Sequence, residues 1–324
     1  MKIAVTGASG HIGNNLCRML VDAGHQVKAL IHRNIDGLKD MPVEQVRGDV
    51  TSETDLTRLC KGCEVLFHLA ACISIRKNDS LCRNINIDSC LNVVRAARRE
   101  KVRKIIHFSS IHAFRHIPGL EKLDETTPLA LDSKVSYDYS KAWGQRLMME
   151  ASTDDLDVTV LNPTAIVGPY DYKPSLMGFA LIRFYRGQNP ALIPGGYNWV
   201  DVRDVCLAAI KAIEMGKPGN SYLLGGIWRD LKSVAEEIEK LGGHRPPRLE
   251  LPIWLAQVGE PFLNLHALLR NKEPLYTSVS LHTLKNSHRN ISSEKARSEL
   301  GFNPRPFSET LQDTIRWFRE NHYL

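Results

Sequence analysis

The stretch TGASGHIG, residues 6–13, decides the fold of this chain of 324 residues. The apolar segment KIAV precedes it and apolar residues at helical spacing follow it, which predicts a strand, a turn and the start of a helix. Gly7, Gly10 and Gly13 would make a tight turn, let the backbone approach a pyrophosphate and allow close helix–strand contact. Because a helix N-terminus offers unpaired N–H groups and a positive dipole end, the stretch predicts a dinucleotide-binding loop. The alternative is a purely structural glycine turn. The expected cofactor contacts of the loop are Gly7, Ser9, Gly10, His11, Ile12 and Gly13.

The first half of the chain alternates strand and helix patterns. The expected strands lie at residues 2–7, 26–32, 43–49, 64–71, 104–110 and 157–168, with a further strand at 221–226. The expected helices lie at 11–24, 51–62, 81–99 and 136–152. Nearly continuous apolar strands that alternate with helices are typical of a parallel sheet covered on both faces. The fold class is therefore α/β, with a Rossmann-type doubly wound parallel sheet.

The second half changes character, because proline and glycine cluster in GPYDYKPS (168–175) and in NPALIPGGYNW (189–199). Helical patterns follow at 232–243, near 253–270, and twice in the C-terminal tail. We expect a dinucleotide-binding domain over residues 1–165, with 199–225 returning to it. Residues 166–198 and 226–324 are expected to form a smaller C-terminal substrate-binding α/β domain.

Composition excludes several classes of protein. The net charge of +6 is spread over the chain without a long basic run, which favours a solvated surface over nucleic-acid binding. We see neither a signal peptide nor an apolar run long enough to span a membrane. The seven scattered cysteines and their odd number are typical of a reduced, cytoplasmic protein. Cys60 and Cys63 form one CxxC without a second ligand pair, so no metal is expected.

The end of the second strand, ALIHRN, bears on the choice of cofactor. NAD-binding proteins of this class carry an acid there for the ribose hydroxyls, but Ile31 occupies that place. His32 and Arg33 follow and could face a 2′-phosphate, which favours NADP over NAD. Alternatively, Arg33 stacks on adenine or points to solvent. Asp49 and Val50 are expected near the adenine ring. Leu69, Ala70 and Ala71 are expected on the nicotinamide side.

The segment YDYSK, residues 137–141, carries a proton-transfer pattern. Tyr137 and Lys141 share one helix face, whereas Tyr139 lies about 200° from Tyr137. A lysine cation and an oxidised nicotinamide would favour the phenolate and lower the pKa of Tyr137. Ser110 ends the fifth strand in FSSIHAF, 27 residues before Tyr137, and could orient a substrate oxygen. Together the residues predict hydride and proton transfer between a nicotinamide and a carbonyl or alcohol.

These motifs resemble the extended short-chain dehydrogenases/reductases over essentially the whole chain. The segments that carry the resemblance are TGASGHIG (6–13), GDV (48–50), HLAA (68–71), NINIDSCLNVV (84–94), FSS (108–110), YDYSK (137–141), NPTAIVGP (162–169) and WVDVRDV (199–205). The resemblance implies a catalytic triad of Ser110, Tyr137 and Lys141, with Lys141 also holding ribose hydroxyls. It implies that Asn86 braces the catalytic helix and that Asn162 and Pro163 contact the cofactor. Relatives often pair through helices near 81–99 and 134–151, so a homodimer is possible.

Within the family, the chain is most similar to dihydroflavonol-reductase-like proteins and hopanoid-associated sugar epimerases. Reductase and epimerase readings share one triad, so other positions must separate them. Epimerases of nucleotide sugars usually carry an arginine where this chain has Tyr197, and a tyrosine cannot neutralise a diphosphate. This favours a reductase of a small-molecule carbonyl, with an epimerase or dehydratase as the alternative. A third possibility is a regulatory protein with little turnover. His112, Tyr170 and Tyr197 are candidate substrate contacts, although His112 could serve only the strand exit.

Overall fold

The computed structural model of the protein describes residues 1–33, 35–73, 79–255, 281, 283–284 and 287–324. Its strands are β1 (Lys2–Thr6), β2 (Gln26–Ile31), β3 (Glu44–Arg47), β4 (Val65–His68), β5 (Lys104–Phe108), β6 (Asp157–Pro163), β7 (Ala165–Val167), β8 (Gly196–Asp201), β9 (Ser221–Leu224) and β10 (Ile227–Asp230). Its α-helices are α1 (His11–Asp22), α2 (Glu53–Cys60), α3 (Ser80–Arg99), α4 (Ser136–Glu150), α5 (Leu176–Tyr185), α6 (Val202–Met215), α7 (Leu231–Lys240), α10 (Glu294–Leu300) and α11 (Phe307–Glu320). Two short 3₁₀ turns are η1 (Asp36–Leu38) and η2 (Ile111–Ala113).

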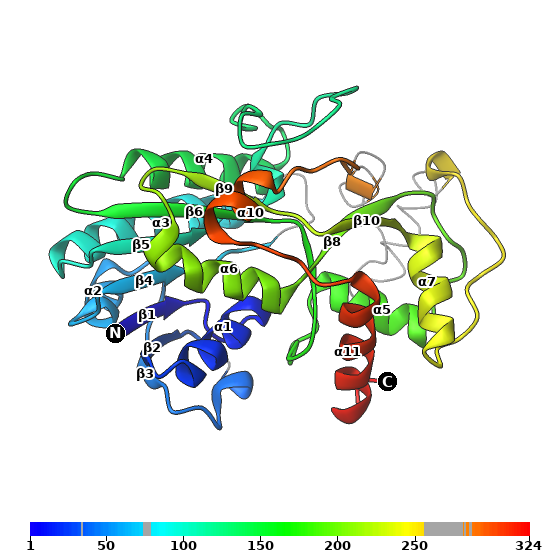
Figure 1. Cartoon of the computed structure of the whole chain (residues 1–324), viewed down its shortest axis with the longest axis horizontal. Helices are drawn as coiled ribbons and strands as arrows, with labels where there is room; N and C mark the ends of the chain where they lie inside the picture. The colour runs from blue at the N-terminus through cyan, green and yellow to red at the C-terminus, as the bar shows by residue number, and fades with distance from the viewer. Residues whose placement is uncertain (34, 74–78, 256–280, 282, 285–286) are drawn as a thin grey trace.

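Seven strands of the described residues form one sheet in the order β3-β2-β1-β4-β5-β6-β9. Every neighbouring pair in this sheet is parallel. Each strand corresponds to one of the apolar segments expected from the sequence, and the Rossmann-type fold class is confirmed (Figure 1). The chain order reverses between β1 and β4, and such a switch point leaves a ligand crevice at the carboxyl ends of the strands.

Helices cover both faces of the large sheet. Figure 1 shows α1 and α6 on one face, with α3 and α4 on the other. Successive strand residues enter opposite cores: Ile3 and Val5 of β1 pack with α1 and α6, whereas Ala4 packs with α2, α3 and α4. Leu16 of α1 and Leu56 of α2 are fully buried, and burial of such a side chain contributes roughly 2 kcal/mol each. The two cores hold the carboxyl ends of the strands in fixed register.

Three other strands form a second, smaller sheet in the order β10-β8-β7. Helices α5, α7 and α11 pack on it through Leu181, Val234 and Leu311, around the buried ring of Trp199. Of the helix expected near 253–270, residues 253–255 are helical and the remainder lies outside the described residues. The expected domain boundaries stay a prediction.

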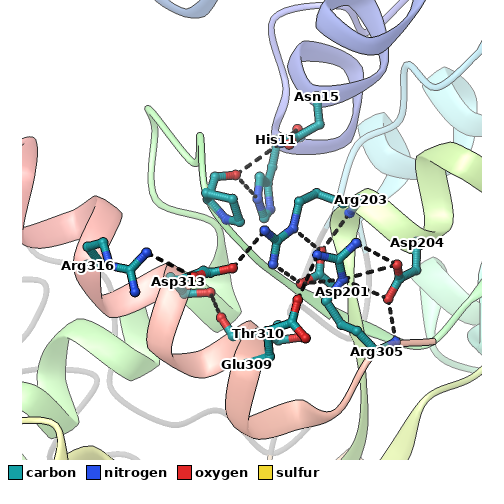
Figure 2. Close-up of polar contacts among 12 residues, drawn as sticks. His11, Asn15, Asp201, Arg203, Asp204, Arg305, Glu309, Thr310, Asp313 and Arg316 are labelled. Carbon is teal, nitrogen blue, oxygen red and sulfur yellow. Dashed lines mark hydrogen bonds and ion pairs between the residues drawn. The ribbon is translucent and has the colours of Figure 1, made fainter.

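An ion-pair network joins the C-terminal tail to the start of α6 (Figure 2). The fully buried carboxylate of Asp201 accepts from Arg203 at 2.7 Å and lies 3.5 Å from the guanidinium of Arg305. Arg305 also binds Asp204 at 2.9 Å, and Arg203 reaches Asp313 of α11 at 2.8 Å. Because each buried carboxylate meets a guanidinium, the network ties α11 to the carboxyl end of β8.

In the part of the chain that the structure describes, no helix is long and apolar enough to cross a membrane. All seven cysteines are free thiols. Burial raises the pKa of Cys60 to about 12 and that of Cys63 to about 11. The CxxC thiols are therefore protonated and unreactive at neutral pH, in line with a structural role.

Candidate active site

The glycine loop lies at the switch point between β1 and β4. Gly7 has a φ of +67°, which favours glycine, and a Cβ there would lie 2.7 Å from the main-chain nitrogen of Ala70. A Cβ at Gly13 would overlap the main-chain oxygen of Gly7. Gly10 is the N-cap of α1 and provides no side-chain acceptor, so the N–H groups of the first turn face an open loop. This cradle fits the pyrophosphate of a dinucleotide.

The side chains of the other loop residues have different surroundings. Nε2 of His11 and Nδ2 of Asn15 both contact the main-chain oxygen of Pro169, at 3.1 and 3.0 Å (Figure 2). Nδ1 of His11 lies 4.0 Å from the buried carboxylate of Asp171. Ile12 packs partly against the core, and Ser9 is partly exposed. A cofactor contact from His11 or Ile12 is therefore expected from the main chain, while the His11 side chain links the loop to the segment after β7.

Thr6, the last residue of β1, is a residue whose role sequence reasoning missed. Its hydroxyl accepts from the N–H groups of Leu69 and Ala70, both at 3.2 Å, and so holds the exit of β4 against the glycine loop. Its single proton is directed to Nδ1 of His68 at 2.8 Å. Burial, helped by the charge of Lys141, lowers the pKa of His68 to about 3, so the ring is a neutral acceptor.

The expected adenosine end carries one guanidinium, one imidazole and one acid. His32 and Arg33 follow β2 and are exposed. Nε2 of His32 lies 3.3 Å from the carboxylate of Asp49, the residue after the third strand that was expected beside adenine. Hydrogen bonds from Thr51, followed by the charges of His32 and Arg33, lower the pKa of Asp49. The Arg33 guanidinium and the His32 imidazole therefore lie with a single carboxylate at this end of the crevice. Val50 is partly buried next to Asp49.

The structure brings Ser110, Tyr137 and Lys141 together at the carboxyl end of β5. The Ser110 hydroxyl is hydrogen-bonded to Tyr137, which lies in the first turn of α4. One turn later, Nζ of Lys141 donates to the main-chain oxygen of Phe108 at 3.1 Å. Tyr139 points elsewhere, as the spacing predicts, with the guanidinium of Arg83 4.1 Å from its ring centroid. The catalytic role of the three residues stays a prediction.

Burial dominates the protonation of the two ionisable members. It raises the pKa of Tyr137 above its ordinary value, although the hydrogen bond from Ser110 acts in the opposite direction. Burial also lowers the pKa of Lys141 to about 8. We expected a lysine cation together with an oxidised nicotinamide to lower the pKa of Tyr137. Within the chain, desolvation of the phenolate has the larger effect and raises this pKa, and the combined effect of lysine and nicotinamide stays a prediction.

Two buried asparagines brace the site. Asn86 of α3 accepts from the Cys72 N–H at 2.8 Å and donates to the Ser140 hydroxyl at 3.0 Å, which ties α3 and the exit of β4 to α4. Asn162 of β6 donates to the main-chain oxygen of Ser110 at 3.0 Å and to Gln145 of α4. Since the Asn162 side chain is fully buried, a cofactor contact from Asn162 or Pro163 is expected from the main chain.

The three candidate substrate residues have different surroundings. Nδ1 of His112 lies 2.9 Å from Asp138, and its ring meets the Tyr137 ring at 5.3 Å between centroids. Tyr170 packs under the guanidinium of Arg18 and beside Trp317, away from the contacts of the triad. The Tyr197 ring lies edge-on to Trp199, at 5.6 Å, on the smaller sheet. Only His112 is placed beside the triad by these contacts.

Folding also gathers a His/Cys cluster that the sequence spacing does not indicate. The donor atoms of His68, Cys90 and His107 lie within 4.8 Å of one another, and all three side chains are buried. Burial raises the pKa of Cys90 to about 12, and the charge of Lys141 acts on all three residues. The charge of Lys141 disfavours a second cation there, so the cluster is better described as buried packing beside Lys141.

The doubly wound sheet, the glycine cradle and the Ser-Tyr-Lys cluster define a dinucleotide-binding protein of the oxidoreductase type. The sequence model of the NAD dependent epimerase/dehydratase family matches residues 3–225. The chain belongs to this family, which falls within the extended short-chain dehydrogenases/reductases.

Three similar proteins match it along nearly their whole length. Sterol demethylase protein B of Methylococcus capsulatus is 33% identical over 327 residues, covering 99% of both chains. A provisionally named dihydroflavonol 4-reductase of Synechocystis sp. is 30% identical over 335 residues, covering 99% of this chain and 95% of the relative. The crystal structure of gox2253 superposes with a TM-score of 0.85 at 29% identity, covering 100% of this chain and 99% of the other.

Proposed function

We propose that the protein is an NAD(P)-dependent oxidoreductase that transfers a hydride between nicotinamide and a secondary alcohol or ketone of a small molecule. The observation that carries the proposal is the hydrogen bond between Ser110 and Tyr137 at the carboxyl end of β5, on the same sheet edge as the glycine cradle. Ligands of open parallel sheets bind at this edge. The names of the full-length relatives, a sterol demethylase protein and a dihydroflavonol 4-reductase, support a reaction of this kind.

Each residue of the cluster has a distinct task. The bound nicotinamide would donate or accept the hydride. Tyr137 is protonated, because burial raises its pKa, and can donate a proton to the oxygen of a ketone. The Ser110 hydroxyl orients the same oxygen. Lys141, charged below pH 8 or so, stabilises negative charge on the phenol oxygen and can hold ribose hydroxyls. The alcohol forms when the carbonyl carbon has gained the hydride and its oxygen the proton.

NADP is the proposed cofactor. His32 and Arg33 are exposed directly after β2, where the guanidinium, with the imidazole beside it, could bind a 2′-phosphate. Ile31, at the end of β2, stands where an acid would accept the ribose hydroxyls of NAD. Asp49 weakens this preference, since its carboxylate lies beside His32. The family description, which names NAD, keeps NAD as the alternative.

The surroundings of Tyr197 support an uncharged substrate. Its ring packs on Trp199 and provides no positive charge for a diphosphate. An epimerase acting on a nucleotide sugar remains the alternative function, since the family includes such enzymes and the same triad would serve it. A regulatory protein with little turnover is the third possibility, and the intact cluster of Ser110, Tyr137 and Lys141 argues against it.

The test is reduction of a panel of cyclic and aryl ketones by NADPH, with Tyr137→Phe and Tyr139→Phe as matched variants. We expect Tyr137→Phe to lose roughly 10²–10⁴-fold in turnover while it still binds NADPH. Tyr139→Phe should keep its activity, because Tyr139 packs under Arg83. Normal turnover by Tyr137→Phe would contradict the mechanism. Conversion of UDP- or GDP-sugars to epimers without net cofactor use would favour the alternative.

Two copies of the chain are expected to pair through α3 and α4. Leu81 and Leu91 of α3 are exposed, and a dimer would bury them. Light scattering of the purified protein measures the mass; a monomer at all concentrations would contradict this expectation.

A further inference from the structure

Two of the seven free cysteines are in contact beside the candidate active site. Cys72 follows the exit of β4, and Cys82 lies in the first turn of α3. The two thiols are hydrogen-bonded to one another, and the Cys82 thiol also donates to the main-chain oxygen of Cys72 at 3.1 Å. A disulfide requires two cysteines that the fold already holds this close together.

Hydrogen bonds of the main chain keep both cysteines in place. The Asn86 amide accepts from the Cys72 N–H at 2.8 Å and donates to the Cys72 main-chain oxygen at 2.9 Å. The Cys82 N–H donates to the carboxylate of Asp79, the N-cap of α3, at 3.0 Å. Because these bonds fix the backbone on both sides of the contact, the fold itself keeps the two thiols together.

Solvent exposure sets the order in which the two thiols react. Cys72 is partly exposed, whereas the other six cysteines are buried. Burial raises the pKa of Cys72 and raises that of Cys82 to about 12, so both thiols are protonated at neutral pH and react slowly there. An oxidant from solvent therefore meets Cys72 first, and Cys82 follows as the thiol that resolves the intermediate.

We propose that Cys72 and Cys82 are a modification site, at which a small-molecule disulfide such as oxidised glutathione converts the two thiols into one reversible disulfide bond. Cys72 attacks one sulfur of the glutathione disulfide, which forms a mixed disulfide and releases the first glutathione thiol. Cys82 then attacks the Cys72 sulfur and releases the second. The two cysteines lose two electrons and two protons, and the glutathione disulfide gains them as two thiols.

The bond would join two parts of the candidate active site. Cys72 directly follows Ala71, which is expected on the nicotinamide side, and Cys82 lies one turn before Asn86, which braces α4. Oxidation therefore ties the exit of β4 covalently to α3 and closes a ring of residues 72–82. The inference is independent of the proposed function, because bond formation involves neither a substrate nor the nicotinamide.

The experiment treats the reduced full-length protein with glutathione disulfide at mildly alkaline pH, where a larger fraction of the thiols is ionised. The remaining thiols are blocked with iodoacetamide, and linked peptides are mapped by mass spectrometry. Cys60 and Cys63 are the internal control, since they lie three residues apart but are both buried. Cys72→Ser and Cys82→Ser are the matched variants. The melting temperature is measured before and after oxidation, and the reaction is repeated in urea that unfolds the chain.

We expect a single linkage, between Cys72 and Cys82, that dithiothreitol reverses, with Cys60 and Cys63 still reduced. Cys82→Ser should stop at a mixed disulfide on Cys72, and Cys72→Ser should keep Cys82 as a free thiol. The oxidised native protein should melt several degrees above the reduced one, because the bond restricts the unfolded chain.

Four results would overturn the inference: no linkage, a linkage of Cys72 to a different cysteine, a linkage that forms only in urea, or a lower melting temperature after oxidation. A lasting mixed disulfide on Cys72 of the native protein would also overturn it, because Cys82 would then fail to resolve the intermediate. Since no readout uses turnover, each of these results leaves the proposed function standing.

Discussion

The amide of Asn86 and the hydroxyl of Ser140 are joined by a buried hydrogen bond of 3.0 Å, one turn away from Tyr137. The same amide closes a pair of hydrogen bonds with the main chain of Cys72, so one side chain connects α3, α4 and the exit of β4. The position of Tyr137, the proposed proton donor, is therefore set by a residue on a different helix.

Replacing Asn86 by alanine should misplace α4 and leave buried polar groups unpaired. We expect the free energy of unfolding to fall by about 1–3 kcal/mol, and kcat to fall more than affinity for the cofactor. Urea unfolding and NADPH titration measure the two effects. Asn84→Ala is the control, because Asn84 is exposed on the same helix. Equal effects of the two variants would show that the brace has no special role.

Substitutions at two glycines of the loop should have different effects, one on stability and one on cofactor affinity. A Cβ at Gly13 would overlap the main-chain oxygen of Gly7, so Gly13→Ala should lose several kcal/mol of stability or fail to fold. At Gly10 the nearest atom is 3.3 Å from an added Cβ, and φ is −77°, so Gly10→Ala should fold. Its methyl group would face the pyrophosphate, so cofactor affinity should fall instead. Thermal unfolding with and without NADPH distinguishes the two; a soluble, stable Gly13→Ala protein would refute the packing argument.

Lys141 should make stability depend on pH. Burial lowers its pKa from 10.5 to about 8, so the folded chain releases this proton at lower pH than the unfolded chain does. Below pH 8 both states keep the proton and the buried charge opposes folding; between pH 8 and 10.5 only the unfolded state keeps it, so stability rises with pH. The difference amounts to roughly 3 kcal/mol over that window.

Lys141→Met removes the titration. We therefore expect the variant to be the more stable protein at pH 7, and the difference to shrink as pH rises toward 10. Urea unfolding of both proteins at each pH gives the comparison. A difference that stays constant with pH would mean that Lys141 is not desolvated in the folded chain.

Arg33 should distinguish the two nicotinamide cofactors. If its guanidinium binds a 2′-phosphate, Arg33→Ala should weaken NADPH by about tenfold and leave NADH almost unchanged. Arg99→Ala, which removes an exposed charge at the end of α3, controls for net charge. Fluorescence titration with both cofactors is the measurement. Tighter binding of NADH than of NADPH by the native protein would overturn the assignment of NADP.

The sequence was sufficient for the large sheet because its signals are local. Short segments between turn and helix patterns, apolar in every case except β3, indicated all seven strands, and the i, i+4 spacing placed Tyr137 and Lys141 on one face of α4. The smaller sheet was harder to foresee. Strand β10, residues Ile227–Asp230, alternates between partly buried and exposed residues and is defined by its antiparallel pairing with β8, a contact that no local pattern encodes.

The missed residues of the site share the same cause. Thr6 contacts His68, and Asp138 contacts His112, across 62 and 26 residues of sequence. Asp138 lies inside the YDYSK segment, but only the position of η2 shows that its carboxylate meets an imidazole. The pKa of Tyr137 was missed for a related reason, since the depth of burial depends on the packing of the whole sheet edge.

The ion pairs between Arg305 and the two carboxylates of β8 and α6 have a consequence for the order of assembly during synthesis. The acids at positions 201 and 204 leave the ribosome about a hundred residues before the arginine that neutralises them. Until then, these two carboxylates lack the charge of Arg305. Without it, they are more stable when hydrated than when buried. The junction between the large sheet and α11 is thus completed only after residue 305 has been made, and a chain that stops short of it would carry this acidic pair unneutralised by its tail.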